Sequence, residues 1–270
     1  MHSDPNDFVI PPIPNLYFMR DNASWIGEGV SLNNPHWPAR RRESLLLGTV
    51  YRHHPRFANL GTPIWFGDRP EHVWPATLEG GDILVLNRHT LLVGCGERTA
   101  PAAVEMLAER LFQESSFQEV LVARFRKARS VMHLDTVLTQ VDRHVFNVYP
   151  GIFESMQLFS LTYRQGSIHV DALPMEHIQA ELARVLEVDS IRFITTGGDY
   201  IHQQREQWDD GSNTFAIAPG VVMAYSRNAA TNRKLRDAGL EVIEIDASEL
   251  PRGRGGSRCM TQPIYRREIP

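Results

Sequence analysis

The sequence lacks most of the features that would assign it to a special class of protein. Only two of its 270 residues are cysteines, Cys95 and Cys259, which is too few for a disulfide framework and fits a reducing compartment. No apolar run approaches the roughly 18 residues that span a bilayer. The first residues also lack the charged and apolar regions of a secretion signal. The sequence alone therefore predicts a soluble, cytoplasmic protein with no membrane partner.

The sequence also lacks an excess of charge of one sign, since it has 28 Lys and Arg residues and 32 Asp and Glu residues. Nucleic-acid binding needs a dense basic surface, so no nucleic-acid partner is expected. The basic run Arg40–Arg42 is followed by Glu43 and, taken alone, is typical of a solvated helix face. No spacing typical of metal ligands occurs, and we predict neither a metal nor another cofactor.

What the chain does contain is a regular alternation of strands and helices. Residues 1–14 are polar and rich in proline, so they form no regular element, and residues 15–270 are expected to form one catalytic domain. Apolar patterning predicts strands over 82–87, 90–93, 133–138, 145–148, 214–217, 221–225 and 242–245, and helices from 101, over 178–186 and near 228–237.

Polar motifs recur along this alternation. They lie at Asp21, Glu79, His133, Gly197 and Cys259, at intervals of 58, 54, 64 and 62 residues. Such a period predicts a cyclic or stacked α/β repeat. If the repeats form a ring, the polar motifs meet at its centre.

Cys259 lies in a glycine-rich loop, residues 252–260, that also contains Arg252, Arg254 and Arg258. Reactive cysteines act as thiolates, which neighbouring cations favour by lowering the thiol pKa. Glycines let the backbone approach a ligand closely. A buried core cysteine is the alternative, but the flanking residues favour a nucleophile followed by a short strand.

Two further motifs carry carboxylates. His133 and Asp135 are two residues apart, which on a strand places both on one face, as a general acid/base beside a cation-binding carboxylate. Two surface residues at a strand end are the alternative. The segment Glu79–Asp82 has a glycine pair between its acids and predicts a close-approach turn that presents Glu79, or else a plain turn. The turn at Gly197–Asp199 is similar but has no glutamate.

Seven stretches of the chain resemble, in the same order, the signature blocks of the arginine deiminase family in the guanidino-group-modifying, or pentein, superfamily. They are residues 14–21, 37–43, 78–82, 96–99, 132–137, 205–211 and 254–260. The resemblance implies a pentein-type α/β propeller built from ββαβ modules around a central site. We expect about four of the five modules here, without the first module and its helical insertion. A homo-oligomer or a partner chain would then complete the ring.

The resemblance also implies the residues of the reaction. Cys259 would be the nucleophile and His133 the general acid/base. Asp21 and Asp135 would bind the substrate guanidinium, with Glu79 acting beside them. These assignments agree with the chemistry, because carboxylates that accept paired N–H bonds are well suited to bind a planar guanidinium.

Five more residues are implied to bind the rest of a free arginine. Contacts to its α-amino and α-carboxylate groups would come from Asn15, Arg40, Arg98 and Arg254, with Phe18 completing the substrate site. The implied reaction converts L-arginine to L-citrulline and ammonia through a covalent thiouronium intermediate on the nucleophile.

Two other readings of the same motifs remain open. One is a sibling activity, such as amidine transfer or hydrolysis of a modified arginine; agmatine fits less well because it has no carboxylate. The other is an inactive fragment that needs a partner chain. Two positions depart from the family pattern: Cys95, and Arg258, which stands where a histidine is familiar. Either could alter the pocket.

Overall fold

The computed structural model describes residue 8, residues 10–68 and residues 75–267. Within these residues, four small sheets repeat one pattern: two antiparallel strands, then a helix, then a third strand parallel to the second. The first comprises β1 (Ala23–Ile26), β2 (Gly29–Leu32), α1 (Arg41–His53), α2 (Pro55–Ala58) and β3 (Ile64–Phe66). The second comprises β4 (Ile83–Val85), β5 (Thr90–Cys95), α4 (Pro101–Glu114) and β6 (Glu119–Arg124).

The remaining two sheets continue the pattern toward the C-terminus. The third comprises β7 (Leu138–Asp142), β8 (Val145–Val148), α5 (Ile178–Leu186) and β11 (Arg192–Thr195). The fourth comprises β12 (Phe215–Ala218), β13 (Val221–Tyr225), α7 (Ala229–Asp237) and β14 (Glu241–Ile245). Two additions stand outside it: the hairpin β9 (Gln157–Arg164) and β10 (Ser167–Leu173), which extends the second sheet, and helix α6 (Tyr200–Trp208). The ββαβ repeat predicted from the sequence is thus present four times in the described residues.

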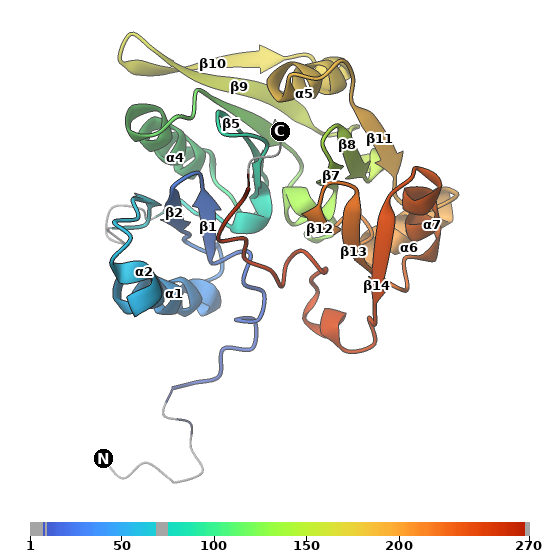
Figure 1. The fold of residues 1–270 in the computed structure, drawn as a ribbon, viewed down its shortest axis with the longest axis horizontal. Coiled ribbons are helices and arrows are strands. Elements are labelled where there is room, and N and C mark those ends of the chain that lie inside the picture. The colour runs from blue at the N-terminus through green and yellow to red at the C-terminus, as the bar shows by residue number, and fades with distance from the viewer. Residues whose placement is uncertain (1–7, 9, 69–74, 268–270) are drawn as a thin grey trace.

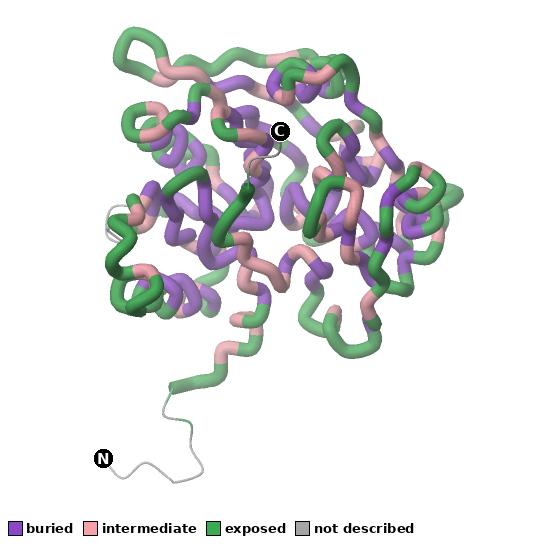
Figure 2. The backbone as a smooth tube through the Cα atoms, in the orientation of Figure 1, coloured by how far each residue is buried: buried purple, intermediate pink, exposed green. Residues whose placement is uncertain are grey.

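The sheets are arranged around a centre through which the C-terminal segment passes (Figure 1). Neighbouring sheets share apolar cores: Trp65 of β3 packs with the second sheet, Leu121 of β6 with the third, and Val141 of β7 with the fourth. The buried residues accordingly lie toward the inside of each unit (Figure 2). Because each core joins consecutive sheets, the loops at their inner ends are held facing a common centre.

Helix α4 shows how the sequence specifies a local element. Pro101 occupies its first turn, where a missing backbone N–H has no consequence. Val104, Leu107 and Leu111 recur at helical spacing and are all buried. At the end of α7, Gly239 has a φ of +95°, as expected for a glycine just beyond a helix. These predictions are confirmed.

The strand predicted over residues 133–138 is wrong. His133 instead precedes a 3₁₀ turn, Leu134–Thr136, and β7 begins only at Leu138. The turn is stabilised because Asp82 Oδ1 accepts the backbone N–H of Leu134 at 2.8 Å and Thr136 Oγ1 donates to the His133 carbonyl at 2.6 Å. These bonds satisfy polar groups that a strand ladder would otherwise satisfy. His133 and Asp135 therefore do not share a strand face.

The segment after Cys259 also differs from expectation. Residues 257–260 form a turn, and residues 261–267 contain no strand. The carbonyl of Cys259 accepts a hydrogen bond from the backbone N–H of Arg20 at 3.0 Å. The loop that carries Cys259 is therefore tied to the N-terminal part of the chain by hydrogen bonds from Arg20 and not by a sheet.

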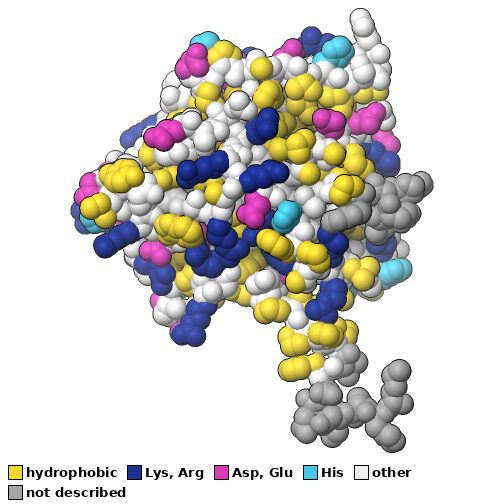
Figure 3. Space-filling model, turned by 180° about the vertical axis from the view of Figure 1, so that it is seen from behind, with side chains coloured by type: hydrophobic (Ala, Val, Ile, Leu, Met, Phe, Trp, Pro, Cys, Tyr) yellow, Lys and Arg dark blue, Asp and Glu magenta, His cyan; other side chains and the backbone are white. Residues whose placement is uncertain are grey.

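The outer surface mixes side-chain types. Seen from behind, hydrophobic side chains are scattered among charged ones, and Lys and Arg gather near the middle of this face (Figure 3). Among the described residues, no helix combines the length and apolarity needed to cross a bilayer.

Candidate active site

A cavity of about 300 Å³ lies at the inner ends of the sheets. Eight of the ten predicted site residues line it: Asn15, Phe18, Asp21, Arg40, Arg98, His133, Arg254 and Cys259. These residues come from loops that precede or follow all four sheets. The convergence that the spacing suggested is therefore observed for the motifs of Asp21, Glu79, His133 and Cys259, and not for that of Gly197.

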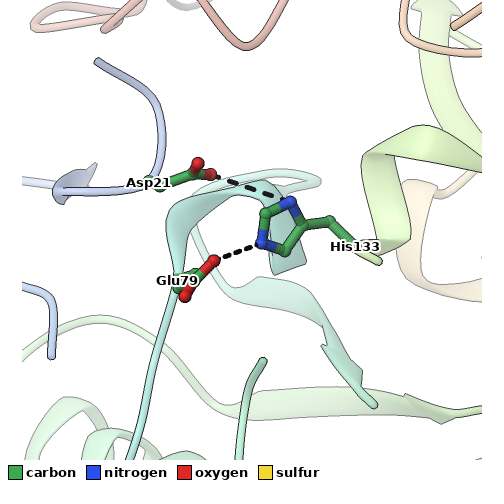
Figure 4. Close-up of side chains that lie close together, drawn as sticks. All are labelled: Asp21, Glu79 and His133. Carbon is green, nitrogen blue, oxygen red and sulfur yellow. Dashed lines mark hydrogen bonds and ion pairs between the residues drawn. The ribbon is translucent and has the colours of Figure 1, made fainter. Parts of the chain in front are cut away.

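The other two predicted residues, Glu79 and Asp135, are fully buried behind the cavity wall. Glu79 reaches the cavity through His133, whose Nε2 lies 2.6 Å from the glutamate Oε2 (Figure 4). On its other side, the Nδ1 atom of His133 lies 3.8 Å from Asp21 Oδ1. Burial alone would lower the pKa of His133, but Asp21 and the bond to Glu79 outweigh it and raise that pKa well above its ordinary value. The imidazole is held as a cation that can donate a proton.

The glycine pair before β4 makes this arrangement possible. A Cβ atom on Gly81 would lie 2.7 Å from the ring of His133, and one on Gly80 would lie 2.0 Å from the carbonyl oxygen of Arg20. Only residues without a side chain fit between these groups. The predicted close-approach turn that presents Glu79 is confirmed. The similar turn at Gly197–Asp199 has another role, since the exposed Asp199 caps helix α6 by accepting the N–H of His202 at 2.9 Å.

Two of the arginines predicted to bind substrate also contact the buried acids. Arg40 Nη1 lies 2.6 Å from Asp21 Oδ2, and its Nη2 lies 2.9 Å from Glu43. Arg98 Nη1 lies 3.3 Å from Glu79 Oε2. Asp21 and Glu79 are therefore not unpaired charges that only a ligand could balance.

Ligand atoms of Asp21, Glu79 and His133 all lie within 4.8 Å of one another, which is close enough to hold a metal ion. The two acids, however, already bind guanidinium groups of the chain. The predicted absence of a metal stays a prediction. The cluster is best described as an ion-pair network around His133.

Cys259 also lines the cavity, and Asn213 fixes its backbone. The Asn213 Oδ1 atom accepts the N–H groups of Arg258 at 3.1 Å and of Cys259 at 3.2 Å, and lies 3.4 Å from the cysteine Sγ. Gly256 packs against the same asparagine, and a Cβ atom there would lie 2.3 Å from its Oδ1. The amide side chain and the glycine together hold the sulfur at the cavity wall.

The expectation that neighbouring arginines lower the pKa of Cys259 is wrong for the unliganded chain. Burial raises the pKa of this thiol well above its ordinary value, and the nearby carboxylates, above all Asp135 and Asp21, raise it further. The arginines of the loop pair elsewhere: Arg252 with Glu249, Arg254 over the ring of Trp208 at 4.3 Å, and Arg258 with Asp135. Cys259 is therefore held as a neutral thiol in the unliganded chain.

Sequence reasoning missed two residues at the site. Asn213 was not singled out, although it accepts the backbone N–H of Cys259. Asp210 lines the cavity, and burial together with the charge of Asp135 raises its pKa to about 7. It also has a φ of +59°, a left-handed conformation that is uncommon for a residue with a side chain. Its place in the stretch 205–211 was the available signal.

Of the two departures from the family pattern, one is remote from the site. Cys95 lines a separate cavity of about 750 Å³ beside the start of α4. Burial raises the pKa of its thiol to about 11. The other departure, Arg258, contacts a predicted site residue directly, with its Nη1 atom 2.8 Å from Asp135 Oδ2.

Comparison with known proteins places this site in context. The sequence pattern of the arginine deiminase family matches residues 1–266. The chain is 45% identical over 268 residues to arginine deiminase 1 of Staphylococcus epidermidis, covering 97% of this chain and 64% of that protein. It is 47% identical over 272 residues to arginine deiminase of Listeria welshimeri, covering 100% of this chain and 66% of that protein. The chain thus spans about two thirds of the length of these relatives.

Solved structures share the fold at low sequence identity. One is the apo form of ArgZ, an arginine dihydrolase from the ornithine-ammonia cycle in cyanobacteria, with a TM-score of 0.65 at 18% identity over 95% of this chain and 33% of that one. Another is a mutant of DDAH from Pseudomonas aeruginosa complexed with citrulline, with a TM-score of 0.60 at 18% identity over 92% of this chain and 76% of that one. The pentein-type α/β fold expected from the sequence is confirmed, while the five-module ring stays a prediction. With its ordered motifs, its fold and its match over residues 1–266, the chain belongs to the arginine deiminase family.

Proposed function

We propose that this chain hydrolyses the guanidinium group of free L-arginine to give L-citrulline and ammonia. The observation that carries the proposal is the meeting of Cys259, His133 and Asp21 at one cavity whose wall also contains Arg40, Arg98 and Arg254. The curated relatives named above are arginine deiminases. A thiol, a cationic imidazole and buried carboxylates are the groups that such a reaction requires.

The first step follows from the electrostatics of the empty cavity. The guanidinium of arginine brings a positive charge between the acids that raise the pKa of Cys259. That charge lowers the thiol pKa, so the sulfhydryl proton leaves to solvent. The thiolate then attacks the central guanidinium carbon, and a C–S bond forms. Asp21 and Asp135 stabilise the cationic N–H groups during the attack.

His133 serves both halves of the reaction. As an imidazolium it donates a proton to the departing nitrogen, the C–N bond breaks, and ammonia leaves a covalent thiouronium on Cys259. The neutral imidazole then accepts a proton from water, which attacks the same carbon. The C–S bond breaks and L-citrulline is released. Glu79, hydrogen-bonded to His133 at 2.6 Å, keeps the ring oriented throughout.

The amino-acid end of the substrate would meet the arginines of the wall. A guanidinium has five N–H donors. Arg98 uses Nη1 for Glu79, and its Nε lies 3.8 Å from Glu97 Oε2, so its remaining N–H groups are left for a carboxylate. Asn15 and Phe18 line the same cavity as Arg254, and Phe18 packs against Gly253 and Gly255 on either side of that arginine. A substrate with an α-carboxylate is therefore preferred over agmatine.

A comparison of substrates tests this assignment. The purified chain is incubated with L-arginine, agmatine or an N-methylated L-arginine, and ammonia and the ureido product are measured together. We expect equal amounts of ammonia and citrulline from L-arginine and at least tenfold less product from agmatine, because agmatine forfeits the charge-assisted bonds to its carboxylate. Faster turnover of the methylated arginine would indicate the sibling activity instead.

We also propose that residues 15–270 act as one catalytic unit, because one cavity is lined by residues from Asn15 to Cys259. Two free, buried thiols fit a reducing compartment such as the cytoplasm. The chain acts either alone or with a second copy or a partner chain. Specific activity measured across a hundredfold range of protein concentration distinguishes these cases, since activity that needs association rises with concentration.

A further inference from the structure

The contact between Arg258 and Asp135 is not explained by the roles assigned so far. Arg258 Nη1 lies 2.8 Å from Asp135 Oδ2, with 12% of the arginine side chain and none of the aspartate side chain exposed. The second oxygen, Asp135 Oδ1, is buried and has no hydrogen-bond partner. One oxygen of this carboxylate is thus held, while the other remains available as an acceptor.

Arg258 is itself fixed through its backbone. Its N–H donates to Asn213 Oδ1 at 3.1 Å, and its carbonyl accepts from Arg20 Nε at 3.2 Å and from Thr261 Oγ1 at 2.7 Å. Asn213 Nδ2 donates in turn to the backbone carbonyl of Asp135 at 3.0 Å. The nucleophile loop and the segment of Asp135 are therefore joined twice, once through Asn213 and once through the side chain of Arg258.

Neither member of the pair borders the 300 Å³ cavity as the structure describes it. Arg258 therefore does not occupy the place of a ligand in this cavity. A guanidinium that donates to one oxygen fixes the plane of a carboxylate and leaves lone pairs on the other oxygen. With this geometry, the arginine supports the binding of a ligand to the second oxygen and does not compete for that oxygen.

We propose that Arg258 is a positioning residue that binds Oδ2 of Asp135, so that Oδ1 accepts an N–H of the substrate guanidinium. The inference rests on the proposed function, and it assigns a role to a position that departs from the family pattern. Arg258 contributes through Asp135 and does not itself touch the substrate. Its charge also balances Asp135 in the empty site, where an unpaired buried carboxylate is costly.

The charge balance yields a measurable consequence. The charged and titratable groups that face Asp135 are Arg258, His133, Asp21, Arg20, Asp210 and Cys259. Burial raises the pKa of Asp135, and Arg258 is the strongest of the groups that oppose the rise. Without that charge, Asp135 binds a proton in the empty site, and this proton must leave before Oδ1 can accept from a cation.

Calorimetry of L-arginine binding tests the proposal. Titrations of a Cys259→Ala parent, which cannot turn over its ligand, are run near pH 7 in two buffers of different ionisation enthalpy. We expect Arg258→Gln to weaken arginine binding about tenfold, the loss of a charge-assisted contact, and to release more protons on binding than the parent. Arg258→Lys restores the charge and should return both values toward those of the parent.

A matched control removes an arginine–carboxylate contact of the same length elsewhere. Arg184 Nη2 also lies 2.8 Å from a carboxylate, that of Glu119, but its side chain is 52% exposed. Arg184→Gln should bind arginine as the parent does. If Arg258→Gln does not fold, Arg258→Met replaces it, since Met keeps the apolar stem without the charge.

The outcomes separate this inference from the proposed function. If the parent binds arginine and the neutral variants bind it with unchanged affinity and proton release, Arg258 has no positioning role while the proposed function stands. Tighter binding by the neutral variants also overturns the inference, because it marks Arg258 as a competitor for Asp135. A folded parent that binds no arginine overturns the proposed function, and with it this role.

Discussion

Two groups of side chains at the cavity hold their charges in different ways. In the first group, Asp21, Glu79 and His133 are paired with one another or with arginines at 2.6 to 3.8 Å. In the second group, Cys259 is buried and Asp210 half-buried, and the pKa of each is raised above its ordinary value. The first group is charged before a ligand arrives, whereas the thiol of the second is held neutral. The difference separates a preformed network of ion pairs from a thiol that has yet to ionise.

The largest expected effect comes from removing one member of the ion-pair network around His133. Glu79→Gln leaves the buried cation of His133 without its partner, which costs about 3 kcal/mol of unfolding free energy. Denaturant unfolding measures it. Glu249→Gln is the control, because it breaks an exposed ion pair with Arg252 and should cost less than about 1 kcal/mol. Equal losses in the two variants would contradict the account.

The pH dependence of that loss has a defined sign. The folded pKa of His133 is raised, so its contribution is complete below the unfolded value of about 6.5 and is lost as pH rises through the folded pKa. The folded pKa of Glu79 is lowered, so its contribution is complete above about 4.5 and is lost in acid. The difference between parent and variant should therefore be largest between about pH 4.5 and 6.5.

Two similar glycine turns provide a second test. Gly81→Ala would place a methyl group 2.7 Å from the ring of His133, and a displacement of about 1 Å in such a ring lowers activity about 100-fold. Gly198→Ala, in the other Gly-Gly-Asp turn, meets only a side-chain atom at 3.9 Å and should leave citrulline formation unchanged. The account fails here if both variants lose activity alike.

The thiol of Cys259 should show a distinct pH profile of alkylation. Because the pKa of Cys259 is raised well above its ordinary value, alkylation by iodoacetamide should rise about tenfold per pH unit through the neutral range. Guanidinium ion added at neutral pH should accelerate alkylation, since it balances the acids. Peptide mass mapping separates Cys259 from Cys95, whose thiol should not respond to guanidinium. A Cys259 rate that is independent of pH near neutrality would show that the free thiol is already ionised.

The smallest expected effect concerns Asp210. Its folded pKa of about 7 lies above the unfolded value of about 3.9, so ionising it destabilises the folded chain increasingly as pH rises between these values. Asp210→Asn removes this cost and should gain about 2 kcal/mol of unfolding free energy between pH 5 and pH 8 relative to the parent. Parallel stability curves for the two proteins would show that Asp210 does not titrate in this range.

Local periodicity and motif order predicted much of this molecule. The strand Val221–Tyr225, the helix Ile178–Leu186 and the start of α4 at Pro101 follow from apolar spacing and proline chemistry. The convergence of Asp21, His133 and Cys259 followed from the order of their motifs. Each of these features depends on residues close to it in the sequence or on a repeated unit.

The features that escaped prediction depend on contacts between distant residues. His133 sits before a turn and not in a strand, and the turn is held because Asp82, 52 positions away, accepts the backbone N–H of Leu134. The pKa of the Cys259 thiol is raised because the thiol is buried near Asp135, and Arg258 pairs with that carboxylate, 123 positions away. Neither partner could be read from the composition of the loop. Electrostatic roles thus required the three-dimensional pairing of charges.

The central claim is that Cys259 is the nucleophile in hydrolysis of L-arginine, and the two cysteines of the chain allow a direct test. Citrulline formation from L-arginine is measured for the parent, for Cys259→Ala and for Cys95→Ala under identical conditions. The account predicts that Cys95→Ala keeps the activity of the parent and that Cys259→Ala loses at least about 1,000-fold. Citrulline formed by Cys259→Ala at the rate of the parent would contradict it.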